Sequence, residues 1–414
     1  MLSLFQNSLP FDQRFRKVST LIVKVTHRCN LDCLYCYENV TKKGEDMSEE
    51  TFRELVDLVL ENTTSPQVTF LFHGGEPTLL SNEWYENGIN YALKKAKEKA
   101  KELTFAMQSN LLGINQKKID LFLKHDIQLG ISLDGPAMLQ STMRGGEDKV
   151  FANFKKLQEV GVKAGVLVTI NDSNYEHFST ICHWLVQEAE VRSFKANVVT
   201  PVGRGFEMES LSAEKVFAAQ YSILEYLIAT EGKELIESNI SMELRRFFAE
   251  EEEAKKLHNT LCHEQQCGAG TGVLGVTPAG HLLPCGRFTW DESEYYLGSL
   301  QDTKPLKKTY QKGFQQKLEK FHALVPENWY NCDRCEAKKV CGFGCQAFIV
   351  RSKEQANVDC LPTKMRYQFY KENKERLYPV YREIQRREGR SDSKRGPIGF
   401  KIKAKDGTYK TYSL

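Results

Sequence analysis

The segment Thr26-His-Arg-Cys29-Asn-Leu-Asp-Cys33-Leu-Tyr-Cys36-Tyr37 places three cysteines in one short loop, with the spacing C-x3-C-x2-C. A cubane iron–sulfur cluster takes four ligands, one for each iron. Three cysteines would therefore leave one iron open to a small molecule, which predicts chemistry at the cluster. The alternative is zinc, but a structural zinc site needs four protein ligands, and only His27 could add a fourth at short range.

The sequence around this loop alternates short β-rich runs with helical stretches from residue 20 to residue 200. The expected strands are 20–26, 67–72, 103–107, 127–133, 162–170 and 194–199. Residues 48–62 have apolar side chains at i, i+3, i+4, i+7 and i+8 from Phe52, with Ser48 as the N-cap, which predicts a helix. Six successive β/α units predict a parallel sheet with right-handed crossovers. Because a complete barrel of this type has eight, we expect an α/β fold with a partial (β/α)6 TIM-like barrel.

Polar and glycine-containing loops follow each of these expected strands. They are Cys29–Cys36, His73-Gly-Gly-Glu-Pro77, Gln108-Ser-Asn110, Ser132-Leu-Asp-Gly-Pro136, Asn171, and Thr200-Pro-Val-Gly-Arg-Gly205. In barrels of this type the carboxyl ends of the strands carry the active site. The sequence therefore predicts that all six loops meet at one cavity.

The cysteine loop after one strand and Gly74-Gly75-Glu76-Pro77 after the next together resemble the radical S-adenosylmethionine (SAM) enzymes. The resemblance implies a [4Fe-4S] cluster on Cys29, Cys33 and Cys36, whose open iron binds SAM. The SAM-binding residues that it implies are Tyr35, Gly74, Gly75, Glu76, Asn110 and Ser132.

Each of these side chains has an expected role. The glycines would let the backbone approach SAM, Glu76 would accept hydrogen bonds from its amino group, and Tyr35 would lie near the adenine. Ser132 and Asn110 would contact the ribose, although either could instead cap a strand or helix end. Asp134 is expected to cap its loop, and His73 either touches the cluster region or is an ordinary strand-end histidine. The sequence assigns no catalytic base.

A second set of cysteines begins near residue 261 and resembles the SPASM extension of the same family. Its pattern is Cys267-x12-Gly280-x4-Cys285, then Cys332-x2-Cys335-x5-Cys341-x3-Cys345, then Cys360, with Cys262 ahead of it. Eight thiolates suit two fully ligated cubanes. The resemblance implies one auxiliary [4Fe-4S] cluster on Cys262, Cys267, Cys285 and Cys345, and another on Cys332, Cys335, Cys341 and Cys360. Whether Cys262 is a ligand stays open, and a pair of zinc ribbons is the alternative.

The predicted domains are a barrel (18–210), a helical connector (211–260), the SPASM domain (261–362) and a C-terminal helix with a basic tail (363–414). Within them we expect a hairpin of 273–276 with 281–284, helix over 363–388, and a tail hairpin with a two-residue turn at Asp406-Gly407. Cys182, the remaining cysteine, is expected to be a buried thiol on a helix.

The resemblance implies a peptide maturase. Such an enzyme cleaves SAM reductively to a 5′-deoxyadenosyl radical, abstracts a hydrogen from a ribosomally made precursor peptide, and installs a thioether or carbon–carbon crosslink with electron loss through auxiliary clusters. The alternative is an anaerobic sulfatase-maturating enzyme, which makes formylglycine. In that group an aspartate thought to act as the base follows the cysteine after the hairpin, whereas Gly286 follows Cys285 here. A more distant alternative is a non-enzymatic iron–sulfur electron carrier.

Composition agrees with an ordinary protein of 414 residues, with 41% hydrophobic and 27% charged residues. The net charge of +3 gives no reason to expect a nucleic-acid partner, and no apolar run is long enough for a membrane span. Without a signal peptide the protein is expected in the cytoplasm, where cysteines serve as metal ligands more often than in disulfides. The expected partners are a precursor peptide and an electron donor such as flavodoxin or ferredoxin. Only 28 residues precede Cys29, too few for a leader-binding domain.

Overall fold

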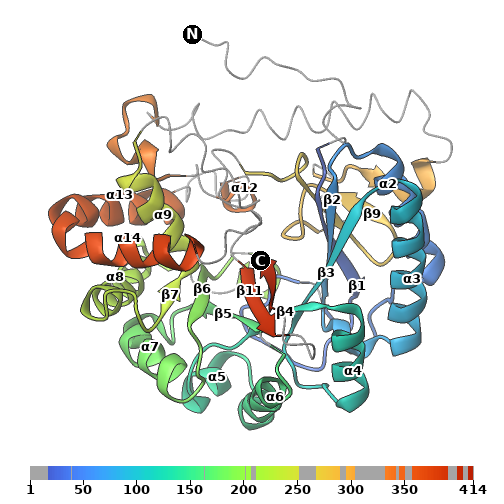
Figure 1. Cartoon of the computed structure of the whole chain (residues 1–414), viewed down its shortest axis with the longest axis horizontal. Helices are drawn as coiled ribbons and strands as arrows, with labels where there is room; N and C mark the ends of the chain where they lie inside the picture. The colour runs from blue at the N-terminus through green and yellow to red at the C-terminus, as the bar shows by residue number, and fades with distance from the viewer. Residues whose placement is uncertain are drawn as a thin grey trace.

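A curved sheet lies at the centre of the molecule (Figure 1). The computed structural model describes residues 17–38, 40–162, 164–200, 202–206, 211–250, 267–289, 295–303, 332–341, 345–349, 357–389, 399–403 and 409–413. Within these residues the sheet has ten strands in the order β10-β9-β8-β1-β2-β3-β4-β5-β6-β7.

The six predicted strands are confirmed and run parallel. They are β1 (Thr20–Thr26), β2 (Gln67–Gly74), β3 (Glu102–Ser109), β4 (Gln128–Ser132), β5 (Ala164–Ile170) and β6 (Ser193–Val198). A short strand that the sequence did not indicate, β7 (Ile236–Glu237), extends the sheet beside β6. The sheet therefore has the partial-barrel order expected from successive β/α units.

Helices cover the outer face of this sheet (Figure 1). They are α2 (Glu49–Asn62), α3 (Asn82–Glu98), α4 (Gln116–His125), α5 (Ala137–Met143), α6 (Glu147–Glu159) and α7 (Phe178–Gln187). Short 3-10 turns follow β2, β5 and β6: η1 (Pro77–Leu79), η2 (Tyr175–His177) and η3 (Gly203–Phe206). Ser48 caps α2 as predicted, because its side chain accepts a hydrogen bond from the Thr51 N–H at 3.0 Å.

The two faces of each strand have different surroundings. Phe70 and Phe72 of β2 are fully buried against aromatic side chains of α2 and α3. Because side chains alternate along a strand, His73 points to the opposite, interior face. The interior face of the parallel strands is therefore where the polar side chains gather.

The predicted hairpin of the C-terminal half is confirmed, with β8 (Val273–Val276) antiparallel to β9 (His281–Leu283). It does not stand apart from the barrel, since β8 pairs in parallel with β1 and β9 pairs with β10 (Gly298–Ser299). This pairing covers the backbone groups that β1 would otherwise expose at the edge of the sheet. The predicted domain boundaries remain predictions.

Helices α8 (Ala213–Ala229) and α9 (Ser238–Phe248) occupy the predicted connector. The helical region predicted at 363–388 consists of two helices, α13 (Asn357–Glu372) and α14 (Lys374–Gly389), which lie beside α8 and α9 (Figure 1). Short elements carry the cysteine-rich segments: η4 (Leu300–Thr303), η6 (Cys332–Arg334), η7 (Glu336–Lys339) and α12 (Gln346–Ile349). None of the described helices has the length and apolarity needed to cross a bilayer.

The predicted tail hairpin is present, with β11 (Gly399–Lys403) antiparallel to β12 (Tyr409–Ser413). The last described pair is Lys403 with Tyr409. The predicted two-residue turn at Asp406-Gly407 lies outside the described residues.

Candidate active site

The first cysteine loop follows β1 directly. Cys33 is buried, whereas Cys29 and Cys36 are partly exposed. The Cys36 N–H donates to the Cys33 carbonyl at 3.2 Å, which tightens the loop. The Cys29 thiol accepts hydrogen bonds from the Leu31 N–H at 3.5 Å and from Asn110 Nδ2 at 3.8 Å. The end of β3 therefore supports the loop through Asn110.

The chemistry of these three thiols fits an iron–sulfur cluster. Burial raises the pKa of Cys29, and it raises the pKa of Cys36 to about 11, so neither thiol ionises at neutral pH without a compensating positive charge. In the part of the chain that the structure describes, no three Cys, His, Asp or Glu side chains come together closely enough to hold a single metal ion. A cubane does not require that, because each thiolate binds a different iron. The three thiols can therefore serve as ligands of a cluster.

The Gly74-Gly75 pair lets the end of β2 pack against the backbone of the cysteine loop. A Cβ on Gly74 would lie 2.3 Å from the Thr26 carbonyl oxygen, and one on Gly75 would lie 2.1 Å from that of Arg28. The N–H groups of Gly75 and Glu76 donate to the same two carbonyls at 2.8 Å. The glycines thus have a packing role that the sequence did not reveal, and their expected contact with SAM remains a prediction.

Glu76 is 1% exposed and joins the ends of two strands. Its carboxylate accepts from the Thr78 N–H at 3.0 Å, the Thr78 hydroxyl at 2.6 Å, the Ser109 hydroxyl at 2.8 Å and the Asn110 N–H at 2.8 Å. Three of these donors converge on Oε1, and only the Asn110 N–H reaches Oε2. The structure thus gives this side chain a positioning role, and its expected contact with the SAM amino group stays a prediction.

Asn110 and Ser132 both lie at the ends of expected strands, and Asn110 contacts the cysteine loop. The Asn110 amide also donates to Asn30 Oδ1 at 2.9 Å, which fixes it over the cysteine loop. Ser132 Oγ accepts from Gln108 Nε2 at 2.9 Å. Gly130 leaves the space that Gln108 occupies, because a Cβ there would lie 2.3 Å from Gln108 Oε1. The ribose contact of Asn110 and Ser132 stays a prediction.

Tyr35 belongs to a buried polar network beneath the loop. Its hydroxyl donates to the Asp134 carboxylate and accepts from Arg144 Nη1 at 2.8 Å. Asp134 Oδ1 also accepts from the Thr169 N–H at 2.8 Å. This carboxylate therefore links the cysteine loop to β5 and does not cap the loop that follows it. Burial raises the pKa of both Tyr35 and Asp134. Arg144, which no sequence signal singled out, supplies the positive charge.

A second buried cluster lies on the interior face of β1 and β2. Lys24 forms an ion pair with Glu38 at 3.0 Å and donates to the Phe288 carbonyl at 3.0 Å. Tyr37 Oη lies 3.0 Å from His73 Nε2. Burial lowers the pKa of His73 to about 3, with Lys24 and Arg287 adding to the effect, so the ring is neutral.

The tautomer of His73 follows from its neighbours. Its Nδ1 accepts from the Gly74 N–H at 2.7 Å, so Nε2 carries the proton and donates to the Tyr37 hydroxyl. Sequence reasoning missed this cluster. The one available signal was Lys24, a charged residue in the middle of the apolar run Thr20–Thr26.

The segment after β9 enters the same interior. The Arg287 N–H donates to the Cys285 thiol at 3.4 Å, and its guanidinium donates to the Thr200 hydroxyl. The same guanidinium stacks on the rings of Tyr37 and Phe348, 5.7 Å from each ring centre. Arg287 thereby joins the first cysteine loop, the end of β6 and the cysteine-rich half of the chain.

The second cysteine set falls into two places in space. Cys267, Cys285 and Cys345 pack against one apolar cluster made of Ala269, Leu283, Phe288, Tyr295 and Ala347. Cys332, Cys335 and Cys360 line a cavity of about 490 Å³. Each place holds three of the four cysteines that the SPASM resemblance implies for one cluster, and the ligand assignments stay predictions. Cys341 follows Val340 at the end of η7, and Cys262 lies outside the described residues.

Cys182 stands apart from both groups. It is fully buried in α7, and burial raises the pKa of its thiol.

Comparison with known proteins adds the following. Residues 23–185 match the Radical SAM superfamily. The chain is 28% identical over 177 residues to the cysteine-type anaerobic sulfatase-maturating enzyme of Clostridium novyi (strain NT), covering 40% of this chain and 47% of that protein. It is 25% identical over 333 residues to the antilisterial bacteriocin subtilosin biosynthesis protein AlbA of Bacillus subtilis (strain 168), covering 78% and 66%. The aligned regions thus span less than two thirds of either relative.

A solved structure shares the fold. It is described as "Native anSMEcpe with bound AdoMet and Cp18Cys peptide" and matches with a TM-score of 0.70 at 19% identity, over 89% of this chain and 99% of that one.

Proposed function

Since this chain carries a radical SAM domain over residues 23–185, a domain that uses a [4Fe-4S] cluster and SAM, we propose that it is an enzyme that matures ribosomally made peptides. Its substrate is a precursor peptide in which it installs a thioether or carbon–carbon crosslink. Two observations support a peptide substrate: the similarity to AlbA over 78% of the chain, and the peptide in the anSMEcpe structure that shares the fold.

Cys29, Cys33 and Cys36 would hold the cluster that binds SAM, and the ends of β2, β3 and β4 would hold SAM itself. The bound cofactors supply the radical that removes a hydrogen from the peptide. The packing of Gly74 and Gly75 against the loop, together with the Glu76 network, keeps the strand ends in fixed positions. The hydrogen bonds among Tyr35, Asp134 and Arg144 hold the cysteine loop in place.

The observation that carries the choice of substrate class is the position of Gly286. A Cβ on this residue would lie 2.5 Å from Ile22 Cγ2 of β1, so the backbone after Cys285 presses directly on the barrel wall. The sulfatase-maturating group is expected to carry its base at this position, and an aspartate here would have to displace Ile22. The glycine therefore argues against formylglycine synthesis.

Sulfatase maturation remains the second candidate function, because a specific observation favours it. The fold match to anSMEcpe extends over 89% of the chain, and the Clostridium novyi enzyme is 28% identical over 177 residues. Both candidates need the same cofactors and a low-potential electron donor such as flavodoxin or ferredoxin. They differ in the product.

Anaerobic reconstitution of the full chain with iron, sulfide, SAM and dithionite tests the shared chemistry, and 5′-deoxyadenosine is the expected product. Co-expression with short cysteine- or aromatic-rich peptides encoded beside the gene tests the substrate class. A peptide that loses two hydrogens and resists cleavage between the joined residues supports the maturase. A product aldehyde that reacts with a hydrazide probe on a sulfatase peptide would instead establish the second candidate.

A further inference from the structure

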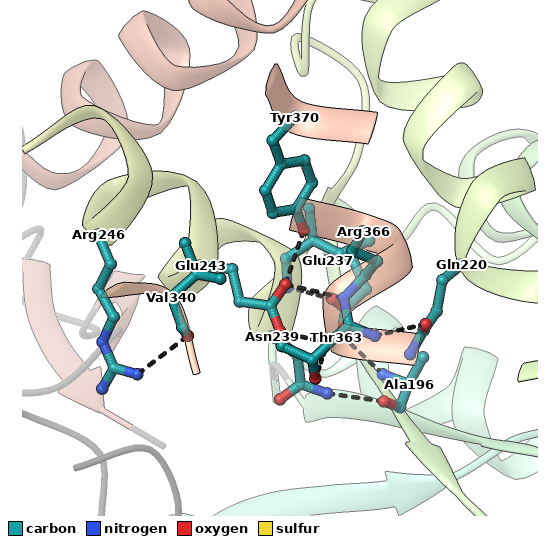
Figure 2. Close-up of polar contacts among 11 residues, drawn as sticks. Ala196, Gln220, Glu237, Asn239, Glu243, Arg246, Val340, Thr363, Arg366 and Tyr370 are labelled. Atoms are coloured by element: carbon teal, nitrogen blue, oxygen red, sulfur yellow. Dashed lines mark hydrogen bonds and ion pairs between the residues drawn. The ribbon is translucent and has the colours of Figure 1, made fainter. Parts of the chain in front are cut away.

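Helix α9 is fixed to the barrel at its first turn (Figure 2). Glu237 accepts hydrogen bonds from the Ala196 N–H at 2.9 Å and from the Ile240 N–H at 2.6 Å, so it caps the helix and ties it to β6. Asn239 Nδ2 donates to the Ala196 carbonyl at 2.7 Å. The position of α9 therefore follows from the barrel.

The middle of α9 holds α13, the helix that carries Cys360. Arg366 Nε donates to Glu243 Oε2 at 2.8 Å, and Tyr370 Oη donates to the same oxygen at 2.7 Å (Figure 2). Arg366 also donates to Gln220 Oε1 of α8 at 2.6 Å. The Glu243 and Arg366 side chains are only 15% and 9% exposed, so this ion pair locks the helices together away from solvent.

The last turn of α9 holds the segment that leads to Cys341. Lys339 Nζ donates to the carbonyls of Phe247 and Ala249 at the carboxyl end of α9, at 3.0 and 2.7 Å. Arg246 Nη1 donates to the Val340 carbonyl at 3.4 Å (Figure 2). One helix thus contacts the segments of both Cys341 and Cys360, and Cys360 shares its cavity with Cys332 and Cys335.

Arg246 is only 4% exposed, and its Nη2 has no hydrogen-bond partner among the described residues. A buried guanidinium with an unpaired N–H group destabilises the folded chain unless a negatively charged group lies nearby. Burial lowers the pKa of Arg246, and the charges of Glu243 and Cys341 oppose that effect. Glu243 is already bound by Arg366 and Tyr370. The other negative charge that acts on Arg246 is that of Cys341.

We propose that Arg246 balances the negative charge of the auxiliary cluster held by Cys332, Cys335, Cys341 and Cys360, and so raises its reduction potential. This inference rests on the proposed function, because it needs a cluster at those cysteines. A cubane with four thiolates is anionic and gains one more negative charge on reduction, so a buried cation stabilises the reduced form more than the oxidised form. Arg246 is a positioning residue that acts through the cluster, not a catalytic residue.

The test is an EPR-monitored redox titration of the full chain, reconstituted with iron in a Cys29→Ala/Cys33→Ala/Cys36→Ala background so that only the auxiliary clusters give signals. We expect Arg246→Gln to make reduction of one of the two clusters about tenfold less favourable, a shift of about 59 mV to lower potential for one electron. Arg246→Lys keeps the charge and should stay near the parent potential. Arg245→Gln is the matched control, because Arg245 pairs with Glu388 at 2.8 Å.

If the Arg246→Gln protein binds auxiliary iron and its clusters keep the parent's reduction potentials, the inference is overturned but the proposed function stands. An equal shift in Arg245→Gln also overturns it, since the effect would then be an unspecific charge effect. If Arg246→Gln takes up no auxiliary iron, Arg246→Lys decides: retained iron supports the charge requirement, and lost iron overturns it. Zinc in place of iron overturns both proposals.

Discussion

The two cysteine regions of this molecule are held in different ways. The first loop lies within eight residues of sequence, and main-chain contacts at the strand ends support it: Gly75 and Glu76 donate directly to Thr26 and Arg28. The second set comes from segments between Cys267 and Cys360, and side-chain ion pairs and hydrogen bonds from α9 bring part of it into place. The supports of the first site thus include main-chain contacts between the ends of β1 and β2, whereas the second depends on side-chain contacts that a single substitution can break.

The largest effect should come from the first loop. We expect Cys33→Ala to abolish 5′-deoxyadenosine formation and to lower the iron content from about 12 to about eight atoms per chain, because one of three four-iron centres loses a ligand. Liquid chromatography with mass spectrometry measures the first quantity, and a colorimetric iron assay measures the second. Cys182→Ala should leave both unchanged, and loss of SAM cleavage in that variant would contradict the ligand assignment.

The next effect tests the side-chain contacts of the second region. Glu243→Gln leaves the positive charge of the buried Arg366 guanidinium without its partner. We therefore expect the free energy of unfolding to fall by about 3–5 kcal/mol. Auxiliary iron should be lost while SAM cleavage persists. Glu225→Gln is the control, since Glu225 and Arg376 form an exposed pair that contributes little to stability. Equal losses in the two variants would show that α9 does not brace the second region.

A smaller effect should come from the backbone contact of the first region. Gly75→Ala places a methyl group 2.1 Å from the Arg28 carbonyl oxygen, so the end of β2 must move away from the cysteine loop. We expect a loss of about 1–3 kcal/mol in stability, typical of overpacking, and slower SAM cleavage with the auxiliary iron retained. Thermal unfolding and iron analysis check this. Gly389→Ala, with open space around it, should behave as the parent protein.

The smallest effect at neutral pH should come from His73. Its pKa is about 3 in the folded chain and about 6.5 in the unfolded chain, so between these values the unfolded state binds more protons and stability rises with pH. His73→Gln should therefore change little at pH 7 and should flatten the pH dependence of unfolding between about pH 4 and 6.5. His27, whose pKa burial lowers to about 4, keeps part of the slope. Denaturant unfolding at a series of pH values measures the free energy of unfolding. An equal dependence on pH for the parent protein and His73→Gln would contradict this prediction.

The alternation of strands and helices, the Ser48 cap and the hairpin of β8 with β9 were all predictable, because each depends on residues close together in sequence. The pairing of β8 with β1 was not, since nothing in either strand specifies a partner more than 200 residues away.

The candidate site divides in the same way. The spacing of Cys29, Cys33 and Cys36 is a local pattern, so the sequence alone indicated the cluster loop and the strand-end glycines beside it. The partners of Lys24, Arg246 and Arg287 lie 14 to 264 residues away, and only the folded chain brings them together. Ligand spacing is set by covalent geometry along one loop, whereas the charges that surround it are placed by burial, which exists only after the strands and helices have packed.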